Sequence, residues 1–162
     1  MRHGALLQLL DAKVAPEWVD YNGHMNDAAY AIVFSRAVDA LMDRVGLDAG
    51  ARRASGRTLF TLQMTLHYFK EAREAQALGV SCQLLEHDSK RLRIWLEMSA
   101  GADGARLAAS EQLLISVDRT EAGAKAAPWR AETLAALDAL AKAQNGLAAP
   151  AQAGKGIALK RA

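Results

Sequence analysis

The chain has 162 residues, of which 51% are hydrophobic and 23% are charged, and its formal net charge is +2. This length is typical of one domain with a substantial core, and the small net charge excludes the strong basic excess of a general nucleic-acid binder. No segment approaches the ~18 apolar residues that a membrane-spanning helix requires, and no secretory cleavage pattern is visible. We therefore expect one cytoplasmic domain that binds neither nucleic acid nor membrane.

A dense polar group lies between a predicted strand over residues 12–19 and a predicted long helix over residues 28–45. The Asn-Gly pair at residues 22–23 is a strong turn signal, because both residue types tolerate left-handed backbone angles. Such a density of carboxylates, amides and histidine indicates a functional segment rather than a simple turn. The group consists of Asp20, Asn22, His24, Asn26 and Asp27.

The polar group lies at the start of the helix, where Asn26 or Asp27 can serve as the N-cap. The first amide N–H groups of a helix lack partners and the helix dipole is positive there, so a negatively charged oxygen is favoured. A reaction that passes through an oxyanion intermediate would therefore be favoured at the start of this helix. His24 has an alternative interpretation as a metal ligand together with Asp20 or Asp27, but the other histidines are scattered and show no metal-binding spacing.

The remaining pattern predicts an α+β domain in which one helix lies across a curved antiparallel sheet. Gly46 ends the long helix, and residues 48–56 are predicted to form a loop. Strand patterns follow at residues 60–68, 80–85, 92–98 and 106–118, then a helix from Pro128 to about Gly146. We place the domain at residues 1–145 and a tail at residues 146–162.

Two residues of the predicted strands, Glu111 and Cys82, have reactive side chains at positions where the pattern predicts burial. Glu111 lies in register with the apolar residues Ala109 and Leu113, and a carboxylate on a core face is costly unless it is paired, protonated or beside a wet cavity. A bulge that turns Glu111 outward is the alternative. The single cysteine, Cys82, excludes an intrachain disulfide and is interpreted as a packed thiol of the core or of a subunit interface, with a nucleophilic role as the alternative.

The order of elements and the polar segment resemble the hotdog-fold thioesterases, in the branch that includes 4-hydroxybenzoyl-CoA thioesterase and the plant acyl-ACP thioesterases. The family signature Asp-x-x-x-His-x-Asn, closed by a tyrosine on the helix, is matched by Asp20, His24, Asn26 and Tyr30. The plant enzymes carry a glutamate after their second strand, which falls on Glu71. Where their motif has a further asparagine, this chain has Asp27.

A closer likeness is to the bacterial betainyl-CoA thioesterases of carnitine breakdown. It extends the resemblance over nearly the whole chain. It rests on residues 17–26, with the sequence EWVDYNGHMN, on Lys90-Arg91-Leu92, on Glu111-Gln112, and on the ending GKGIAL at residues 154–159.

The resemblance implies hydrolysis of an acyl-CoA thioester without cofactor or metal, with Asp20 as general base or nucleophile. Asn22 and His24 orient Asp20 and the water, Glu71 assists, and backbone N–H groups from Asn26 to Ala28 receive the oxyanion. For CoA phosphates, Lys90 and Arg91 match the family's basic turn. Further candidates are Arg52, Arg53 and Arg57. For a trimethylammonium group, the available aromatic and acidic side chains are Trp18, Tyr21, Tyr68, Glu71 and Glu111.

The family also implies a homodimer with one continuous sheet, so that Glu71 or Glu111 may come from the other subunit; a tetramer is the alternative. Two other functions stay open at this point. One is a non-hydrolytic acyl-CoA-binding protein, and the other is a hotdog dehydratase, whose catalytic histidine lies elsewhere. A thioesterase for another short-chain acyl-CoA is the alternative within the same activity.

Overall fold

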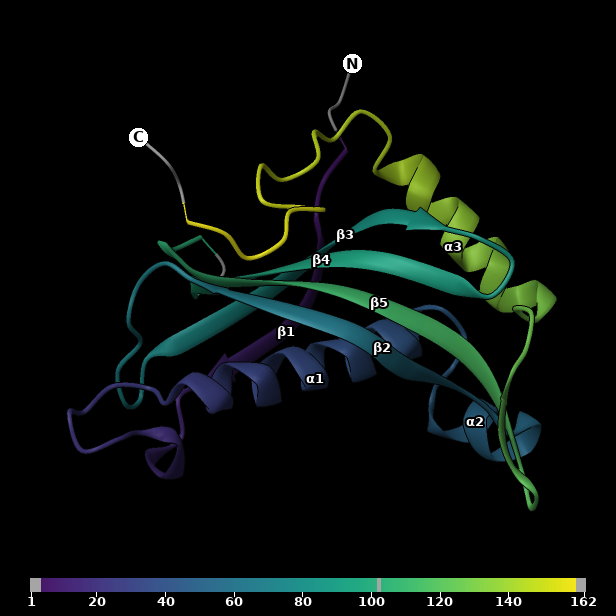
Figure 1. The fold of residues 1–162 in the computed structure, drawn as a ribbon, viewed down its shortest axis with the longest axis horizontal. Helices are drawn as coiled ribbons and strands as arrows, with labels where there is room; N and C mark the ends of the chain where they lie inside the picture. The colour runs from purple at the N-terminus through teal and green to yellow at the C-terminus, as the bar shows by residue number, and fades with distance from the viewer. Residues whose placement is uncertain (1–3, 102, 160–162) are drawn as a thin grey trace.

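The protein folds as one curved antiparallel sheet wrapped around a long helix (Figure 1). The structure is a computed structural model that describes residues 4–101 and 103–159. The strands lie in the order β1-β3-β4-β5-β2, and β6 pairs with β5. The elements are β1 (Leu7–Lys13), a 3-10 turn (Pro16–Trp18), α1 (Asp27–Arg44), α2 (Ala49–Ser55), β2 (Arg57–Tyr68), β3 (Ala77–His87), β4 (Arg91–Ala100), β5 (Arg106–Thr120), β6 (Gly123–Ala126) and α3 (Ala131–Ala143). The predicted α+β fold is confirmed.

Helix α1 supplies the centre of the core. Apolar residues three or four apart form one buried stripe, in which Phe34, Ala37 and Leu41 are fully buried. This stripe packs in one cluster with Ile94 and Leu96 of β4. Neither α1 nor any other helix in the described residues is long and apolar enough to span a membrane.

From Ser110 to Leu114, the two faces of β5 are the reverse of the sequence-based prediction. Leu114 pairs with Leu92 and Ser110 pairs with Leu96, so these residues share the face that packs on α1. Glu111 instead lies opposite Trp95, on the outer face. The prediction was wrong because the outer face of this sheet is also covered, so apolar residues occur on both faces of the strand and their alternation does not identify the core side.

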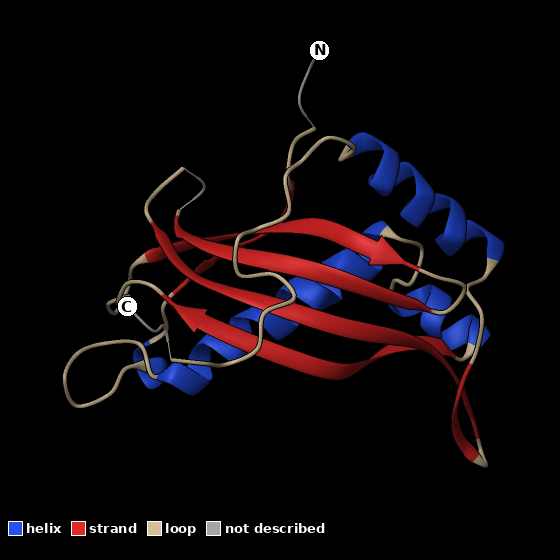
Figure 2. Cartoon of the chain, turned by 45° about the horizontal axis from the view of Figure 1, so that its top comes forward, coloured by secondary structure: helices blue, strands red, loops and turns tan. Residues whose placement is uncertain are grey.

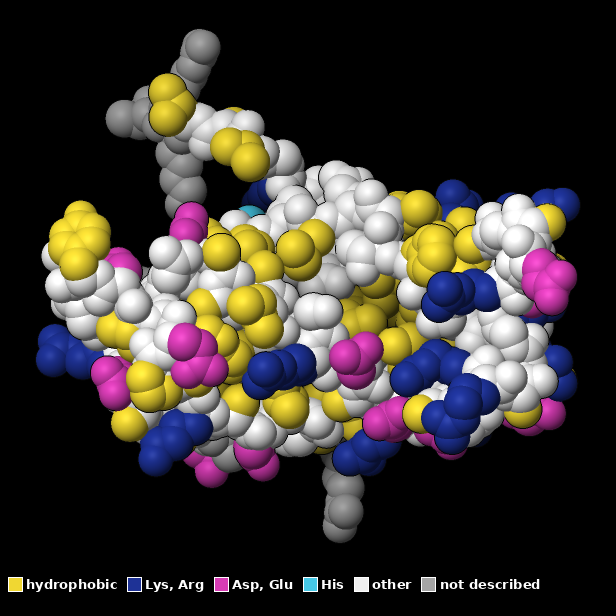
Figure 3. Space-filling model, turned by 90° about the horizontal axis from the view of Figure 1, so that it is seen from below, with side chains coloured by type: hydrophobic (Ala, Val, Ile, Leu, Met, Phe, Trp, Pro, Cys, Tyr) yellow, Lys and Arg dark blue, Asp and Glu magenta, His cyan; other side chains and the backbone are white. Residues whose placement is uncertain are grey.

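Strand β2 forms an edge of the sheet and exposes large apolar side chains. A bulge between Thr61 and Gln63 shifts the pairing with β5, so Leu62 is unpaired and the strict alternation that the sequence predicts is broken. Phe60, Leu62 and Met64 are 44%, 54% and 42% exposed. Figure 3 shows apolar side chains open to solvent in a hollow on the face seen from below.

Two predictions of local structure were wrong. The first strand is β1, and residues 14–19 are outside it, because Pro16 cannot donate to a strand ladder and begins a 3-10 turn. The expected loop at residues 48–56 contains helix α2, which the Asp48 side chain caps by accepting from Ala51 N–H at 2.9 Å. The sequence reading also did not predict β6, and α3 begins at Ala131 rather than at Pro128.

The C-terminal segment crosses the outer face of the sheet, opposite α1 (Figure 2). The Gln83 side chain donates to the Ala148 carbonyl at 3.2 Å, and Gly154 N–H donates to Glu111 Oε2 at 2.8 Å. The tail therefore docks on the sheet through Ala148 and Gly154, whereas Ile157 and Leu159 are exposed. The last three residues of the tail assigned from sequence, and the first three of the domain, lie outside the described residues.

We expect Leu41→Ala to lower the free energy of unfolding by about 2–5 kcal/mol, because it leaves a cavity under the sheet. Leu41 is fully buried, whereas Leu134 on α3 is 37% exposed. The matched change Leu134→Ala should cost about 1 kcal/mol or less. Urea unfolding at one fixed protein concentration measures both, and equal costs would contradict the burial of α1.

Candidate functional site

Asp20 begins a tight loop whose backbone holds one of its carboxylate oxygens. Asp20 N–H donates to the His24 carbonyl at 2.9 Å, and Gly23, with φ of 75°, makes the turn. Asp20 Oδ1 accepts from Asn22 N–H at 2.8 Å and from His24 N–H at 3.3 Å. The second oxygen, Oδ2, accepts no hydrogen bond from any of the described residues. The loop therefore fixes the orientation of the carboxylate and leaves one oxygen available to a water or a substrate.

His24 is joined to the segment that follows β2. Its Nε2 lies 3.1 Å from Glu71 Oε2, and its backbone forms a β-bridge with Arg73. Met25 N–H also donates to the Ala72 carbonyl at 2.8 Å. These contacts bring together the two parts of the sequence signature, although Met25 and Glu71 lie 46 positions apart in the chain.

Two tyrosines line the site beside the start of α1. The rings of Tyr30 and Tyr68 meet edge to face with their centroids 5.2 Å apart, and Tyr68 Oη donates to the Asp27 carbonyl at 3.1 Å. Burial raises the pKa of both phenols, and for Tyr30 the nearby Glu71 carboxylate raises it further. Both therefore stay protonated at neutral pH.

These groups surround an open pocket of about 370 Å³ at one end of the sheet. Six predicted site residues line it: Asp20, Asn22, His24, Asp27, Tyr68 and Glu71. The sequence reading did not assign a place in the site to Met25, Tyr30, Phe69 and Lys70, which also line it. Tyr30 belongs to the family signature. Met25, Phe69 and Lys70 are not part of that signature, and only their position next to predicted site residues in the chain could have indicated them. The lining holds three carboxylates, from Asp20, Asp27 and Glu71, beside Lys70 and His24, so acidic groups predominate.

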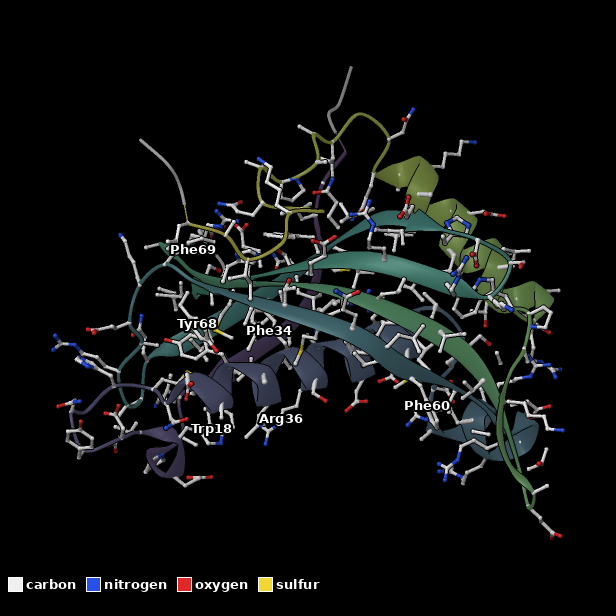
Figure 4. The ribbon with its side chains drawn as sticks, viewed as in Figure 1. Trp18, Phe34, Arg36, Phe60, Tyr68 and Phe69 are labelled. Carbon is white, nitrogen blue, oxygen red and sulfur yellow. The ribbon has the colours of Figure 1, made fainter. Side chains whose placement is uncertain are left out.

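Trp18 and Tyr21 lie outside this pocket. Trp18 is 8% exposed, and the guanidinium of Arg36 covers its ring at 5.0 Å from the centroid (Figure 4). Tyr21 is 97% exposed at the tip of the loop. One face of the Trp18 ring is thus covered by Arg36, a cation of the protein itself, and Tyr21 lies away from the site.

Glu111 also lies apart from the pocket, on the outer face of the sheet. Arg93 Nη1 donates to Glu111 Oε1 at 2.7 Å, and Gly154 N–H holds the other oxygen. The Glu111 hydrogen bond is the main cause that raises the pKa of Arg93. The partly buried carboxylate is therefore paired, which is one of the alternatives that the sequence left open. It also anchors the C-terminal segment that carries the GKGIAL ending.

Lys90 and Arg91 lie at the turn between β3 and β4, at the end of the sheet away from the start of α1 (Figure 1). Arg91 Nη2 lies 2.6 Å from Asp88 Oδ2. Hydrogen bonds from Lys90 N–H and from Arg91 lower the pKa of Asp88 to about 2. Arg91 is thus committed to a carboxylate of its own turn, and neither residue reaches the Asp20 pocket of the same chain.

The backbone amides at the start of α1 are mostly occupied. Asn26 N–H donates to the Trp18 carbonyl at 2.7 Å, and Ala28 N–H is held by the Asn26 and Asp27 side chains at 2.9 Å each. Two of the three amides from Asn26 to Ala28 are therefore used within the protein: the Trp18 carbonyl takes Asn26 N–H, and the capping side chains take Ala28 N–H. Asp27 N–H has no acceptor among the described residues. Asn26 serves as the N-cap.

Cys82 is fully buried in the core on β3, and burial raises the pKa of its thiol to about 12. It therefore remains a protonated, packed thiol, and the nucleophilic alternative has no support. Among the described residues, no group of three or more His, Cys, Asp and Glu side chains is placed to hold a metal ion.

Relatives with known names share this sequence over almost its full length. A betainyl-CoA thioesterase from Pseudomonas aeruginosa is 45% identical over 95% of this chain and 96% of its own length. An L-carnitine dehydrogenase/betainyl-CoA thioesterase from Rhizobium meliloti is 37% identical over 96% of this chain, which matches 31% of that longer protein.

A solved structure shares the fold across the whole chain. A hypothetical protein from Staphylococcus aureus in complex with CoA superposes with a TM-score of 0.86, is 26% identical, and covers 99% of both chains. The family model of the thioesterase-like superfamily matches residues 14–137. The chain therefore belongs to the thioesterase-like superfamily and is an acyl-CoA thioester hydrolase with a hotdog fold.

Proposed function

We propose that the protein hydrolyses betainyl-CoA to betaine and CoA as a step of carnitine degradation. The observation that carries the proposal is the acidic pocket in which Asp20, Asp27 and Glu71 surround two tyrosine rings. Carboxylates and aromatic faces are the groups that bind a trimethylammonium. The name of the Pseudomonas aeruginosa relative supports the same substrate, and the bifunctional Rhizobium meliloti relative supports the link to carnitine.

Asp20 is the group placed to drive hydrolysis. As general base, Oδ2 takes a proton from a water while the water oxygen bonds to the thioester carbon, and the carbon–sulfur bond then breaks to release CoA. As nucleophile, the same oxygen attacks the thioester carbon, the carbon–sulfur bond breaks to release CoA and leave a mixed anhydride, and water then cleaves the anhydride to regenerate Asp20. Asp27 N–H is available to the negative charge on the carbonyl oxygen. His24, held by Glu71, orients this group of side chains.

A homodimer through β2 completes the proposal. The outer edge of β2 pairs with no described strand, and its apolar side chains are exposed. Antiparallel pairing of two β2 strands across a two-fold axis would join the sheets and cover these side chains. Leu62 and Met64 would lie near the centre of such an interface, since they are near the middle of the strand.

We expect Asp20→Asn to lower kcat for thioester hydrolysis by about 100- to 10,000-fold, because the amide cannot take a proton or attack carbon. Asparagine keeps an oxygen that accepts the two loop N–H groups, so the loop should retain its shape. Asp39→Asn, on the exposed face of α1, is the matched control and should retain activity. Thiol release from acyl-CoA measures both, and wild-type turnover in Asp20→Asn would exclude the assigned role.

We expect kcat/KM for betainyl-CoA to exceed that for 3,3-dimethylbutanoyl-CoA by about tenfold or more. The second ester has the same shape but carbon in place of the charged nitrogen, so only the charge differs. Glu71→Gln should reduce this preference because it removes one anion of the pocket. Equal efficiency with both esters in the wild type would refute a cation site.

We expect Met64→Lys to convert the dimer to monomers, because it places a charge at the centre of the β2 interface. Leu134→Lys on α3 makes the same kind of change on another partly exposed leucine and should leave the dimer intact. Light scattering coupled to gel filtration gives both masses. A dimer that survives Met64→Lys unchanged would argue for another interface.

A further inference from the structure

An arginine-lined hollow lies at the end of the molecule opposite the Asp20 pocket. Arg52 and Arg53 of α2, Arg57 of β2 and Arg119 of β5 surround about 400 Å³. Figure 1 places α2 at this end, and Figure 3 shows Lys and Arg side chains gathered there. We call the group the arginine hollow.

Gly56 brings the three elements of the arginine hollow together. It ends α2 with φ of 71°, which lets the chain turn directly into β2. Arg119 N–H donates to the Gly56 carbonyl at 2.9 Å, and a Cβ on Gly56 would lie 2.9 Å from the Arg119 carbonyl oxygen. The absence of a side chain at this position therefore allows the arginines of α2 and β2 to approach β5 closely.

The arginines are held in place without being neutralised. Arg52 Nη1 donates to the Leu47 carbonyl and Arg57 Nη1 to the Pro128 carbonyl, both at 2.6 Å. Among the described residues, no carboxylate lies within 4.0 Å of any of the four guanidiniums, although Asp118 lies beside Gly56. Each guanidinium has five N–H donors, so most of them remain free to bind an anion.

We propose that the arginine hollow binds the phosphate groups of the CoA substrate, a proposal that rests on the proposed thioesterase function. Arginine binds phosphate through two parallel hydrogen bonds, and four uncompensated charges suit the several phosphates of CoA. Lys90 and Arg91, the basic turn that the sequence indicates, are less suitable because Arg91 is paired with Asp88.

The hollow serves the catalytic pocket of the partner subunit. Within one chain the two sites lie at opposite ends of β2, with Arg57 at its start and Tyr68 at its end. When two β2 strands pair antiparallel, the start of one lies beside the end of the other. One substrate then spans the interface, with its thioester beside Asp20 of one subunit and its phosphates in the other.

Calorimetric titration of the wild type and of Arg53→Ala/Arg119→Ala with free CoA tests the phosphate site directly. Both arginines are exposed, so the fold should persist, and a thermal melt checks this. We expect Kd for CoA to rise about tenfold or more. The matched control Lys142→Ala/Lys155→Ala also removes two exposed positive charges, but these lie outside the arginine hollow, so this variant should bind CoA as the wild type does.

An unchanged Kd in the arginine variant, or a wild type that does not bind CoA, overturns the proposal. An equal loss in the lysine control also overturns it, since the effect would then be one of net charge alone. CoA binding that depends on the arginines in a protein that releases no thiol would refute the proposed function and leave the phosphate site intact. With activity present, the ratio of kcat/KM for the CoA ester to that for its N-acetylcysteamine ester should fall about tenfold in the arginine variant.

Mixed dimers test the placement across the interface. One subunit carries Asp20→Asn and the other carries Arg53→Ala/Arg119→Ala. If the hollow serves the partner, one site of each mixed dimer has both wild-type parts, and activity with the wild-type KM for the CoA ester reappears on mixing. If each hollow serves its own subunit, the mixture shows only the raised KM, and the cross-subunit placement is wrong.

Discussion

The packing of α1 into the concave face of the sheet determines the position of every group in the candidate site. The buried stripe of α1, with Phe34 and Leu41 fully enclosed, fixes the helix against β4 and β5. This contact places the first turn of α1 beside the end of β2, where Tyr30 meets Tyr68. The Asp20 loop precedes that turn, and Glu71 follows that strand. A residue signature that runs from Asp20 to Glu71 thereby becomes one pocket.

Much of the fold could be predicted from the sequence, because α1 and the strands β2 to β5 have strong apolar periodicity. The catalytic group could be predicted because the motif from Asp20 to Tyr30 is compact in sequence and resembles a known family. Local errors came from competing signals. Pro16 stopped the expected strand, and Asp48 capped a helix where glycines suggested a loop.

The positions of Glu111 and of the basic residues depended on tertiary contacts that periodicity does not contain. Glu111 is on a covered outer face because the C-terminal segment docks there, about 40 residues later in the chain. Arg119 joins Arg52 and Arg53 only because β5 pairs with β2. Likewise, the availability of each amide at the start of α1 depends on its neighbours in the fold: the Trp18 carbonyl takes Asn26 N–H and the capping side chains take Ala28 N–H, whereas Asp27 N–H meets no acceptor in the part of the chain that the structure describes.

The Asp20 carboxylate divides its two oxygens between folding and chemistry. Oδ1 closes the loop through two backbone N–H groups, and Oδ2 accepts no hydrogen bond from the described residues and is available to the pocket that Asp20 lines. Selection for a stable loop and selection for turnover therefore act on the same side chain. Among natural variants, a descendant that abandons hydrolysis but keeps this fold can still be under selection to retain an oxygen acceptor here. Retention of either aspartate or asparagine at this position would then indicate selection for loop stability. Only aspartate in place of asparagine would indicate selection for hydrolysis.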